Sequence, residues 1–226
     1  MLSDKLIIVR GGGDIATGTI HRLWSAGFQV LVLEAEHPAA IRRQVSLCEA
    51  VYQETAVVEG LEAKLIHSLP EADAVWKSGK VPILIDPKGI CIGELKPAVV
   101  IDAILAKKNL GTNRTMAGLT IGLGPGFTAG KDVDLVIETM RGHNLGRIIK
   151  EGSALPNTGI PGNVGGYAKE RVIHATEEGT LRNIHQIGDI VEQGETIAYI
   201  ETKEDKTEVA ASISGIIRGL IRDGFP

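Results

Sequence analysis

The chain has 226 residues, of which 43% are hydrophobic and 23% charged, and its net charge is −4. This length accommodates one large domain or two smaller ones. The mild negative charge, the scattered Lys and Arg and the 4% aromatic content argue against a nucleic-acid-binding surface. No stretch approaches the roughly 20 apolar residues that span a bilayer, and the apolar run before Arg10 is too short for a secretory signal. We therefore expect a cytoplasmic protein without a membrane or nucleic-acid partner.

The first 34 residues have the pattern of a βαβ unit. The β-branched run at residues 5–10 predicts a buried strand, which leads directly into three glycines. Residues 14–26 predict a helix with Ile15, Ile20, Leu23 and Trp24 on its inner face, and Gly27 ends it. Residues 29–34 predict a second strand. The order strand, glycine loop, helix, strand is typical of nucleotide-binding α/β proteins.

The glycine loop fits the dinucleotide fingerprint G-x-G-x-x-[GA], made here by Gly11, Gly12, Gly13, Asp14, Ile15 and Ala16. In that fingerprint Gly11 allows the tight turn, Gly13 lets the backbone approach a pyrophosphate, and Ala16 lets the helix pack close to the strand. Glu34, about 20 residues further on, can accept a ribose 2′-hydroxyl, which favours NAD over NADP. In the alternative interpretation Asp14 is only the helix N-cap and the glycines only turn the chain.

The middle of the chain continues the alternation of strands and helices. We predict strands at residues 63–66, 81–86, 119–123 and 135–138, and helices at 70–78 and 99–108. In the second helix, Ile101, Ile104 and Leu105 would face inward. Repeated alternation predicts an α/β fold with a Rossmann-like, mostly parallel sheet and helices on both faces, within a nucleotide-binding domain at residues 1–150.

A second glycine loop runs from Gly122 to Asp132 after a predicted strand. It does not fit a P-loop, because Pro125 and Asp132 stand where that motif needs a glycine and a magnesium-binding hydroxyl. Gly124 and Gly126 could line a ligand crevice at the carboxyl ends of the strands, or they could form a structural turn.

A polar cluster follows the last predicted strand. It contains Arg141, His143 and Arg147, which suit contacts to phosphate or carboxylate groups. The alternative is a solvated surface turn. The six histidines are dispersed without a pair four residues apart, and Cys48 and Cys91 lack metal-ligand spacing. We therefore predict no metal site, no disulfide and a buried structural Cys48.

Residues 151–168 are rich in Gly, Pro and Asn and predict a linker. Short β-rich pieces at residues 169–226 predict a small all-β module with a biotinyl/lipoyl-like barrel-sandwich layout, and the sequence leaves open whether its closing strand is complete. Counting from Gly188 or Gly215 places Glu204, rather than Lys203 or Lys206, at the hairpin tip. We therefore expect no covalent lipoyl or biotin, and interpret the module as a docking or assembly unit.

Four segments spread over nearly the whole chain resemble the YqeB-like accessory proteins of selenium-dependent molybdenum hydroxylase systems. They are RGGGDIATG at 10–18, IRRQVSLCEAVYQ at 41–53, GLGPGFTAGKDVDLVIETMRGHNLGRII at 122–149 and NTGIPGNVGGYAKERVIHA at 157–175. The first is also similar to the Rossmann region of xanthine dehydrogenase accessory proteins. The resemblance implies a role in maturation of a molybdenum hydroxylase, and the part that carries over is the glycine loop.

Three hypotheses follow. The leading one is an accessory protein that binds NAD or a molybdopterin dinucleotide and works with a molybdenum hydroxylase or its maturation proteins. The second is an NAD-dependent oxidoreductase with His143 as its base. The third is a non-enzymatic scaffold that docks a hydroxylase subunit through residues 169–226. The sequence leaves open whether any reaction is catalysed, and a homo-oligomer is one option for its assembly.

Overall fold

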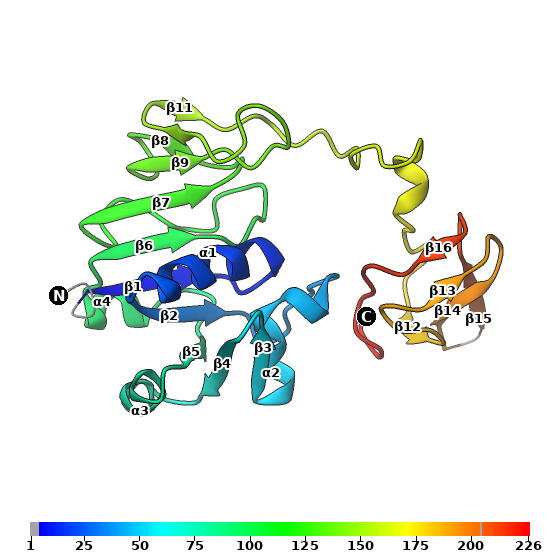
Figure 1. Ribbon diagram of the computed structural model, residues 1–226, viewed down its shortest axis with the longest axis horizontal. Helices are drawn as coiled ribbons and strands as arrows, with labels where there is room; N and C mark the ends of the chain where they lie inside the picture. Colours follow the sequence, from blue (N-terminus) through cyan, green and yellow to red (C-terminus); the bar gives the residue numbers. More distant parts are fainter. Residues whose placement is uncertain (1–4, 204) are drawn as a thin grey trace. The chain divides into compact units, whose positions relative to one another are not determined.

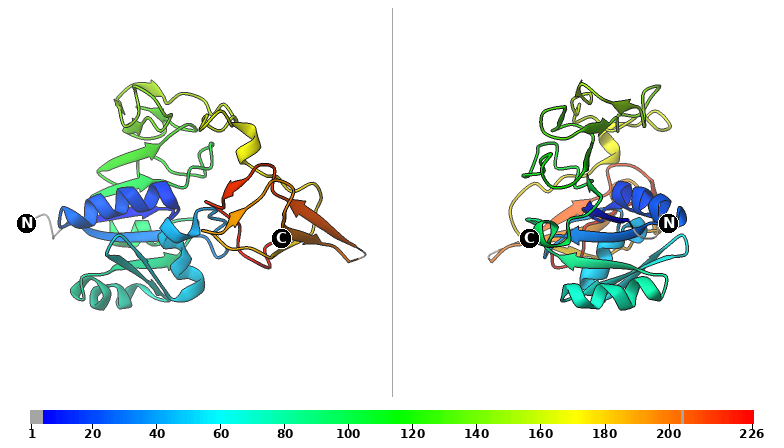
Figure 2. Two further views of the ribbon diagram at one scale, coloured as in Figure 1. Left: turned by 45° about the vertical axis from the view of Figure 1, so that its right-hand side comes forward. Right: turned by 90° about the vertical axis from the view of Figure 1, so that its left-hand side faces the viewer.

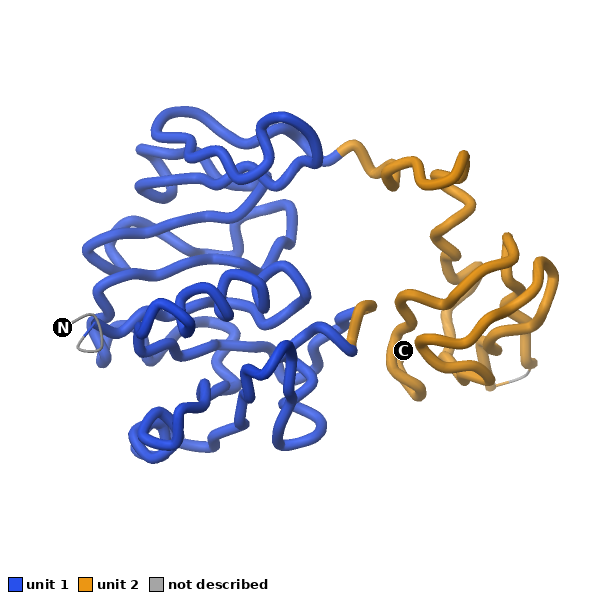
Figure 3. The backbone as a smooth tube through the Cα atoms, viewed as in Figure 1, with its two compact units in different colours: residues 1–40, 44–157 blue, residues 41–43, 158–226 orange. Residues whose placement is uncertain are grey.

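The computed structural model describes residues 5–203 and 205–226, and the chain divides into two compact units. The larger unit comprises Met1–Ala40 and Gln44–Asn157, and the smaller comprises Ile41–Arg43 and Thr158–Pro226 (Figure 3). The boundary near residue 157 falls inside the predicted linker at 151–168.

The larger unit is built on a mostly parallel sheet, which confirms the α/β prediction. Among the described residues it has nine strands in the order β10-β9-β7-β6-β1-β2-β5-β4-β3. The edge strands β3 and β10 pair antiparallel with their neighbours, and the other pairings are parallel. The bounds are β1 Leu6–Arg10, β2 Gln29–Glu34, β3 Thr55–Val58, β4 Leu61–Ile66, β5 Val81–Ile85, β6 Val99–Asp102, β7 Leu119–Leu123, β9 Leu135–Ile137 and β10 Ile148–Ile149.

Helices cover both faces of this sheet (Figures 1 and 2). Alternate residues of β1 enter different cores, because successive side chains of a strand point to opposite faces. Ile7 and Val9 pack on the face of α1 and α2, whereas Ile8 packs on the face of α3 and α4. The helix bounds are α1 Asp14–Ser25, α2 Ala50–Gln53, α3 Ala72–Lys77 and α4 Cys91–Leu95, with 3-10 turns η2 Arg43–Val45, η3 Leu47–Glu49 and η4 Leu69–Glu71.

The predicted helix at 99–108 is wrong. Residues Val99–Asp102 form β6, which pairs with β1 on one side and β7 on the other. The β-branched run favours a strand once two parallel partners are available, and the helical spacing of Ile101, Ile104 and Leu105 is fortuitous. After β6 the chain forms an irregular loop in which Leu105 has φ 58° and Lys107 φ 61°.

The inner face predicted for α1 is also partly wrong. Ile20 is fully buried, and Leu23 and Trp24 pack against the same core. Ile15, however, is 44% exposed. It lies in the first turn of the helix, directly after the glycine loop. The helix otherwise packs as its periodicity predicts.

The smaller unit contains short antiparallel sheets. One consists of β12 Thr180–Asn183, β14 Thr196–Glu201 and β15 Lys206–Ala210, and another pairs β13 Ile190–Val191 with β16 Gly215–Ile216. Val191, Ile197, Ala198 and Ala211 form its core, and η5 Lys169–Arg171 precedes the sheets. The barrel-sandwich layout stays a prediction, and Glu204, predicted at the hairpin tip, lies outside the described residues.

Candidate functional site

The order in which the chain adds strands to the sheet reverses between β1 and β6. From β1 the chain passes through α1 to β2 on one side, whereas from β6 it passes to β7 on the other. The carboxyl ends of β2, β6 and β7 point to the side on which α1 begins (Figure 1). In open α/β sheets, ligands bind at such a reversal, because the two connections diverge and leave a crevice between them.

Gly11 and Gly12 are required by packing within the protein itself. Gly11 has φ 96°, and a Cβ there would lie 3.0 Å from the carbonyl oxygen of Ala103 and from the backbone of Ile104. A Cβ on Gly12 would lie 3.0 Å from the backbone nitrogen of Cys48. The loop therefore fits tightly between the segment after β6 and the segment around η3.

Gly13 differs from its two neighbours. It is the N-cap of α1, with φ −65° and ψ −178°, a backbone conformation that any residue adopts. Within the described ranges, no atom other than those of its chain neighbours lies within 4 Å of the position of its Cβ. Nor does a side chain described here cap α1 at this residue. Packing within the protein does not require a glycine here; glycine is among the residues favoured at an N-cap, and a ligand that approaches the backbone closely would favour it further.

Glu34, at the carboxyl end of β2, points its carboxylate at the glycine loop. Oε2 accepts the backbone N–H of Gly12 at 2.7 Å, and Oε1 accepts that of Ala35 at 2.7 Å. Burial raises the pKa of Glu34, and these two hydrogen bonds offset only part of that rise. The acid thus lies beside the loop, where it can accept a hydroxyl group.

The other side of Gly12 is held by the segment around η3. The carbonyl of Gly12 accepts the N–H of Cys48 at 2.9 Å and the hydroxyl of Thr17 at 3.2 Å. Cys48 is buried as predicted, and burial, followed by the nearby Glu34 and Glu49 carboxylates, raises the pKa of its thiol above the usual range. A thiol that stays protonated is a poor nucleophile, so the role of Cys48 is to pack against the glycine loop.

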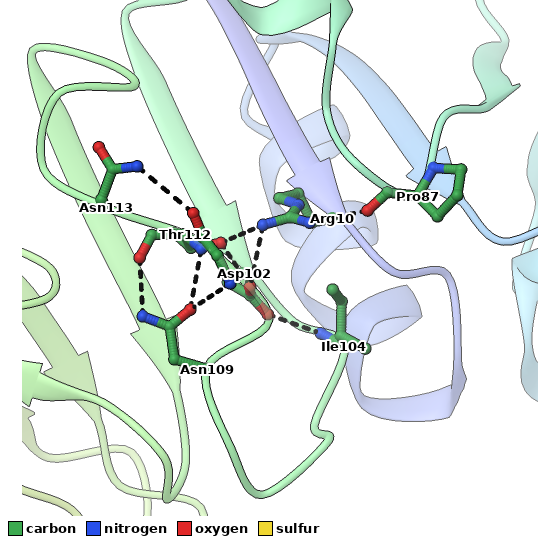
Figure 4. A network of polar contacts seen from close by, with 8 residues as sticks. Arg10, Pro87, Asp102, Ile104, Asn109, Thr112 and Asn113 are labelled. Carbon is green, nitrogen blue, oxygen red and sulfur yellow. Dashed lines mark hydrogen bonds and ion pairs between the residues drawn. The ribbon is translucent and has the colours of Figure 1, made fainter.

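Arg10 and Asp102 form a buried ion pair between the carboxyl ends of β1 and β6 (Figure 4). Arg10 Nη1 lies 3.6 Å from Asp102 Oδ2, and both side chains are at most 3% exposed. The hydroxyl of Thr112 accepts a hydrogen bond from Arg10 and donates one to Asp102 at 2.6 Å. Arg10 also donates to the carbonyl of Pro87 at 2.8 Å. The sequence patterns do not predict this network, although a charged residue at the end of each of two buried strands is a signal for it.

The second glycine loop packs against the protein. It runs into β8 Thr128–Ala129, which pairs with β11 Gly152–Ser153, rather than into a helix as a P-loop would. A Cβ on Gly124 would lie 2.6 Å from the Thr139 hydroxyl, and one on Gly126 would lie 2.8 Å from the backbone of Lys108. Close packing therefore accounts for both glycines.

The polar cluster after β9 is exposed. Arg141, His143 and Arg147 are all solvent-exposed, and their side chains make no hydrogen bond or ion pair with other residues that the structure describes. β9 lies three strands from β1, which corresponds to about 14 Å across the sheet. The segment that contains these three residues leaves the same edge of the sheet as the glycine loop, but at a strand distant from that loop.

Glu138, in contrast, is buried and fully engaged. Its carboxylate accepts the N–H of Met140 at 2.7 Å and that of Leu155 at 2.8 Å. Burial raises its pKa, but these N–H groups together with that of Thr139 outweigh the effect and lower it. Glu138 therefore has a structural role.

In residues 5–203 and 205–226, no group of three or more His, Cys, Asp or Glu side chains is placed to hold a metal ion. Over the same residues, none of the helices has the length and apolar character needed to cross a membrane.

Over 221 residues the chain is 47% identical to the uncharacterized protein YqeB of Escherichia coli (strain K12). The match covers 98% of this chain and 40% of YqeB, so the chain spans about two fifths of that protein's length. No protein-family model and no solved structure matches the chain. The similarity confirms the predicted resemblance to YqeB-like proteins, and along nearly its whole length the chain is similar to one part of YqeB.

Proposed function

We propose that the larger unit is a Rossmann-type domain that binds a dinucleotide at the end of β1, as part of an accessory protein for molybdenum hydroxylase maturation. The observation that carries the proposal is the open position at Gly13, beside Glu34 and at the reversal of strand order. A pyrophosphate would lie against Gly13 and the first turn of α1, whose N–H groups and dipole favour an anion. A ribose hydroxyl would donate to Glu34.

The residues fit either of two ligands, NAD or a molybdopterin dinucleotide. Both have a pyrophosphate for the helix N-terminus and a ribose for the acid. The 2′-phosphate of NADP would bring negative charge to the Glu34 carboxylate, which disfavours that ligand. Of the two ligands, the molybdopterin dinucleotide is the one consistent with the role in hydroxylase maturation that the sequence resemblance implies.

Thermal unfolding of the purified protein with NAD, NADP, FAD, ATP, CTP and a molybdopterin dinucleotide tests which ligand binds. At about 100 times its Kd, a ligand that binds only the folded state adds roughly 2.7 kcal/mol and raises Tm by several degrees. We expect this shift with NAD or the molybdopterin dinucleotide and a smaller one with NADP. Unchanged melting with every ligand would refute the proposal.

A docking role for the smaller unit is the second candidate. Ile190 and Ile216 face each other across β13 and β16, and they are 77% and 58% exposed. Paired exposed apolar side chains mark a contact surface more often than isolated ones do. Binding of a purified molybdenum hydroxylase should be lost in Ile190→Asp and kept in Val57→Asp, whose side chain is exposed on β3 of the larger unit. Equal binding by both variants would exclude this surface.

A further inference from the structure

The loop that leaves β6 packs against both glycine loops. Its first part lies against Gly11, where a Cβ would be 3.0 Å from Ile104 N and Cα. Its end lies against Gly126, where a Cβ would be 2.8 Å from Lys108 N and Cα. Gly11 and Gly126 have φ 96° and 112°, so both the conformation and the space require glycine. The segment Ile104–Lys108 thus connects the two glycine motifs along the carboxyl edge of the sheet.

The backbone of this segment is held in an unusual conformation. Leu105 and Lys107 both have left-handed φ values, of 58° and 61°, without being glycine. Such conformations persist only where the surroundings determine them, and they cluster at ligand-binding sites. The surroundings here are the two glycine contacts together with polar anchors at both ends of the loop.

Those anchors belong to the network of Figure 4. At one end, Asp102 Oδ1 accepts the N–H of Ile104 at 3.2 Å. At the other end, Asn109 Oδ1 accepts the N–H groups of Gly111 and Thr112, each at 2.8 Å, and its amide donates to the Thr112 carbonyl. Thr112 in turn donates to Asp102, so the two ends of the loop are tied together.

We propose that Ile104–Lys108 forms the second wall of the ligand crevice, and that the Lys108 ammonium binds a phosphate group of the ligand. This inference rests on the proposed function and assigns a role to the second glycine loop: Gly126 allows the close contact that positions Lys108. The Lys108 side chain is exposed, and it makes no hydrogen bond or ion pair within the described part of the chain. It is thus available to an anion. Lys108 contacts Gly126 after β7, whereas the hydroxyl-accepting Glu34 ends β2, so the two lie on opposite sides of the reversal between β6 and β1.

Inorganic pyrophosphate is the probe that tests this site without a choice of nucleoside. Backbone amide shifts of the full-length protein, followed by NMR during a pyrophosphate titration, should change for both Gly13 and Lys108. Lys108→Gln should weaken pyrophosphate binding about five-fold, the size expected for one exposed charge contact, and Lys108→Arg should restore most of it. Lys64→Gln, which removes an exposed charge from β4, is the matched control and should bind as the wild type does.

The outcomes separate this inference from the proposed function. Shifts at Gly13 with unchanged affinity in Lys108→Gln would overturn the role of Lys108 and leave the proposed function standing. Shifts at Lys108 without any change at Gly13 would contradict both, because the inference requires one ligand that contacts Gly13 and Lys108 together. Unchanged spectra at both positions would overturn both.

Discussion

The carboxylate of Glu34 accepts the backbone N–H of Gly12 at 2.7 Å, and this contact joins the end of β2 to the loop that follows β1. Because the same carboxylate is the expected acceptor for a ribose hydroxyl, the acid is already oriented by the protein before a ligand arrives. Pre-orientation of this kind reduces the entropy lost on binding.

The raised pKa of Glu34 predicts a pH effect on stability. A carboxyl group whose pKa is higher in the folded than in the unfolded state binds more protons when folded, so stability falls as pH rises from the unfolded pKa through the folded one. Glu34→Gln removes this titration. Urea unfolding between pH 4 and pH 7 should show wild-type stability falling relative to the variant as pH rises. A difference that stays constant with pH would contradict the burial of this charge.

Glu138 should behave in the opposite way. Its pKa is lowered by backbone N–H groups despite burial, so its stabilisation is full above the unfolded pKa and is lost as pH falls through the folded one. Glu138→Gln should cost about 1.5–3 kcal/mol at pH 7, as expected for hydrogen bonds to a charged group. The loss should shrink in acid, which urea unfolding at pH 3–4 measures. The same loss at both pH values would show that the charge is unimportant.

The buried pair of Arg10 and Asp102 predicts a strong asymmetry between single and double variants. Asp102→Leu leaves the Arg10 guanidinium without its carboxylate and should cost about 3–5 kcal/mol. Replacing both residues, as Arg10→Met with Asp102→Leu, should recover much of that loss, because no uncompensated charge remains. Equilibrium unfolding of Arg10→Met, Asp102→Leu and the double variant measures the coupling. Additive losses would mean that the pair does not interact.

Gly12 and Gly13 should respond differently to alanine. In Gly12→Ala the new Cβ would lie 3.0 Å from the Cys48 nitrogen, which cannot move easily because it donates to the Gly12 carbonyl. We expect a loss of about 1–3 kcal/mol, typical of overpacking. Gly13→Ala meets open space and loses only the preference of glycine over alanine at a helix N-cap, so it should cost about 0.5–1 kcal/mol. Similar losses in the two variants would contradict the open position at Gly13.

Local patterns were sufficient to predict much of the larger unit. The β-branched runs of β1, β2 and β5 and the glycines between β1 and α1 act over a few residues, so their structures follow from local propensity. The local pattern of residues Val99–Asp102 does not predict β6, because this segment becomes a strand only through pairing with β1, some 90 residues earlier in the chain. Single-sequence periodicity contains no information about that partner.

Contacts in the site between residues far apart in the chain cannot be predicted from the sequence for the same reason. The Arg10–Asp102 contact and the packing of Gly126 on Lys108 both depend on the order of strands in the sheet. That order also sets the distance of Arg141 and His143 from the glycine loop. The sequence contains residue types suited to bind a dinucleotide, and the strand order determines which of these residues lie close enough together to contact one ligand.

The most direct test of the account is the affinity of the best dinucleotide for wild type, Gly13→Ala and Gly18→Ala, measured by titration calorimetry. Gly18 lies in α1 and also faces open space, so its variant controls for the added methyl group. We predict that Gly13→Ala binds at least about ten-fold more weakly, a loss of roughly 1.4 kcal/mol, while Gly18→Ala binds as the wild type does. Equal affinity of all three proteins, or no binding by the wild type, would contradict a ligand at this loop.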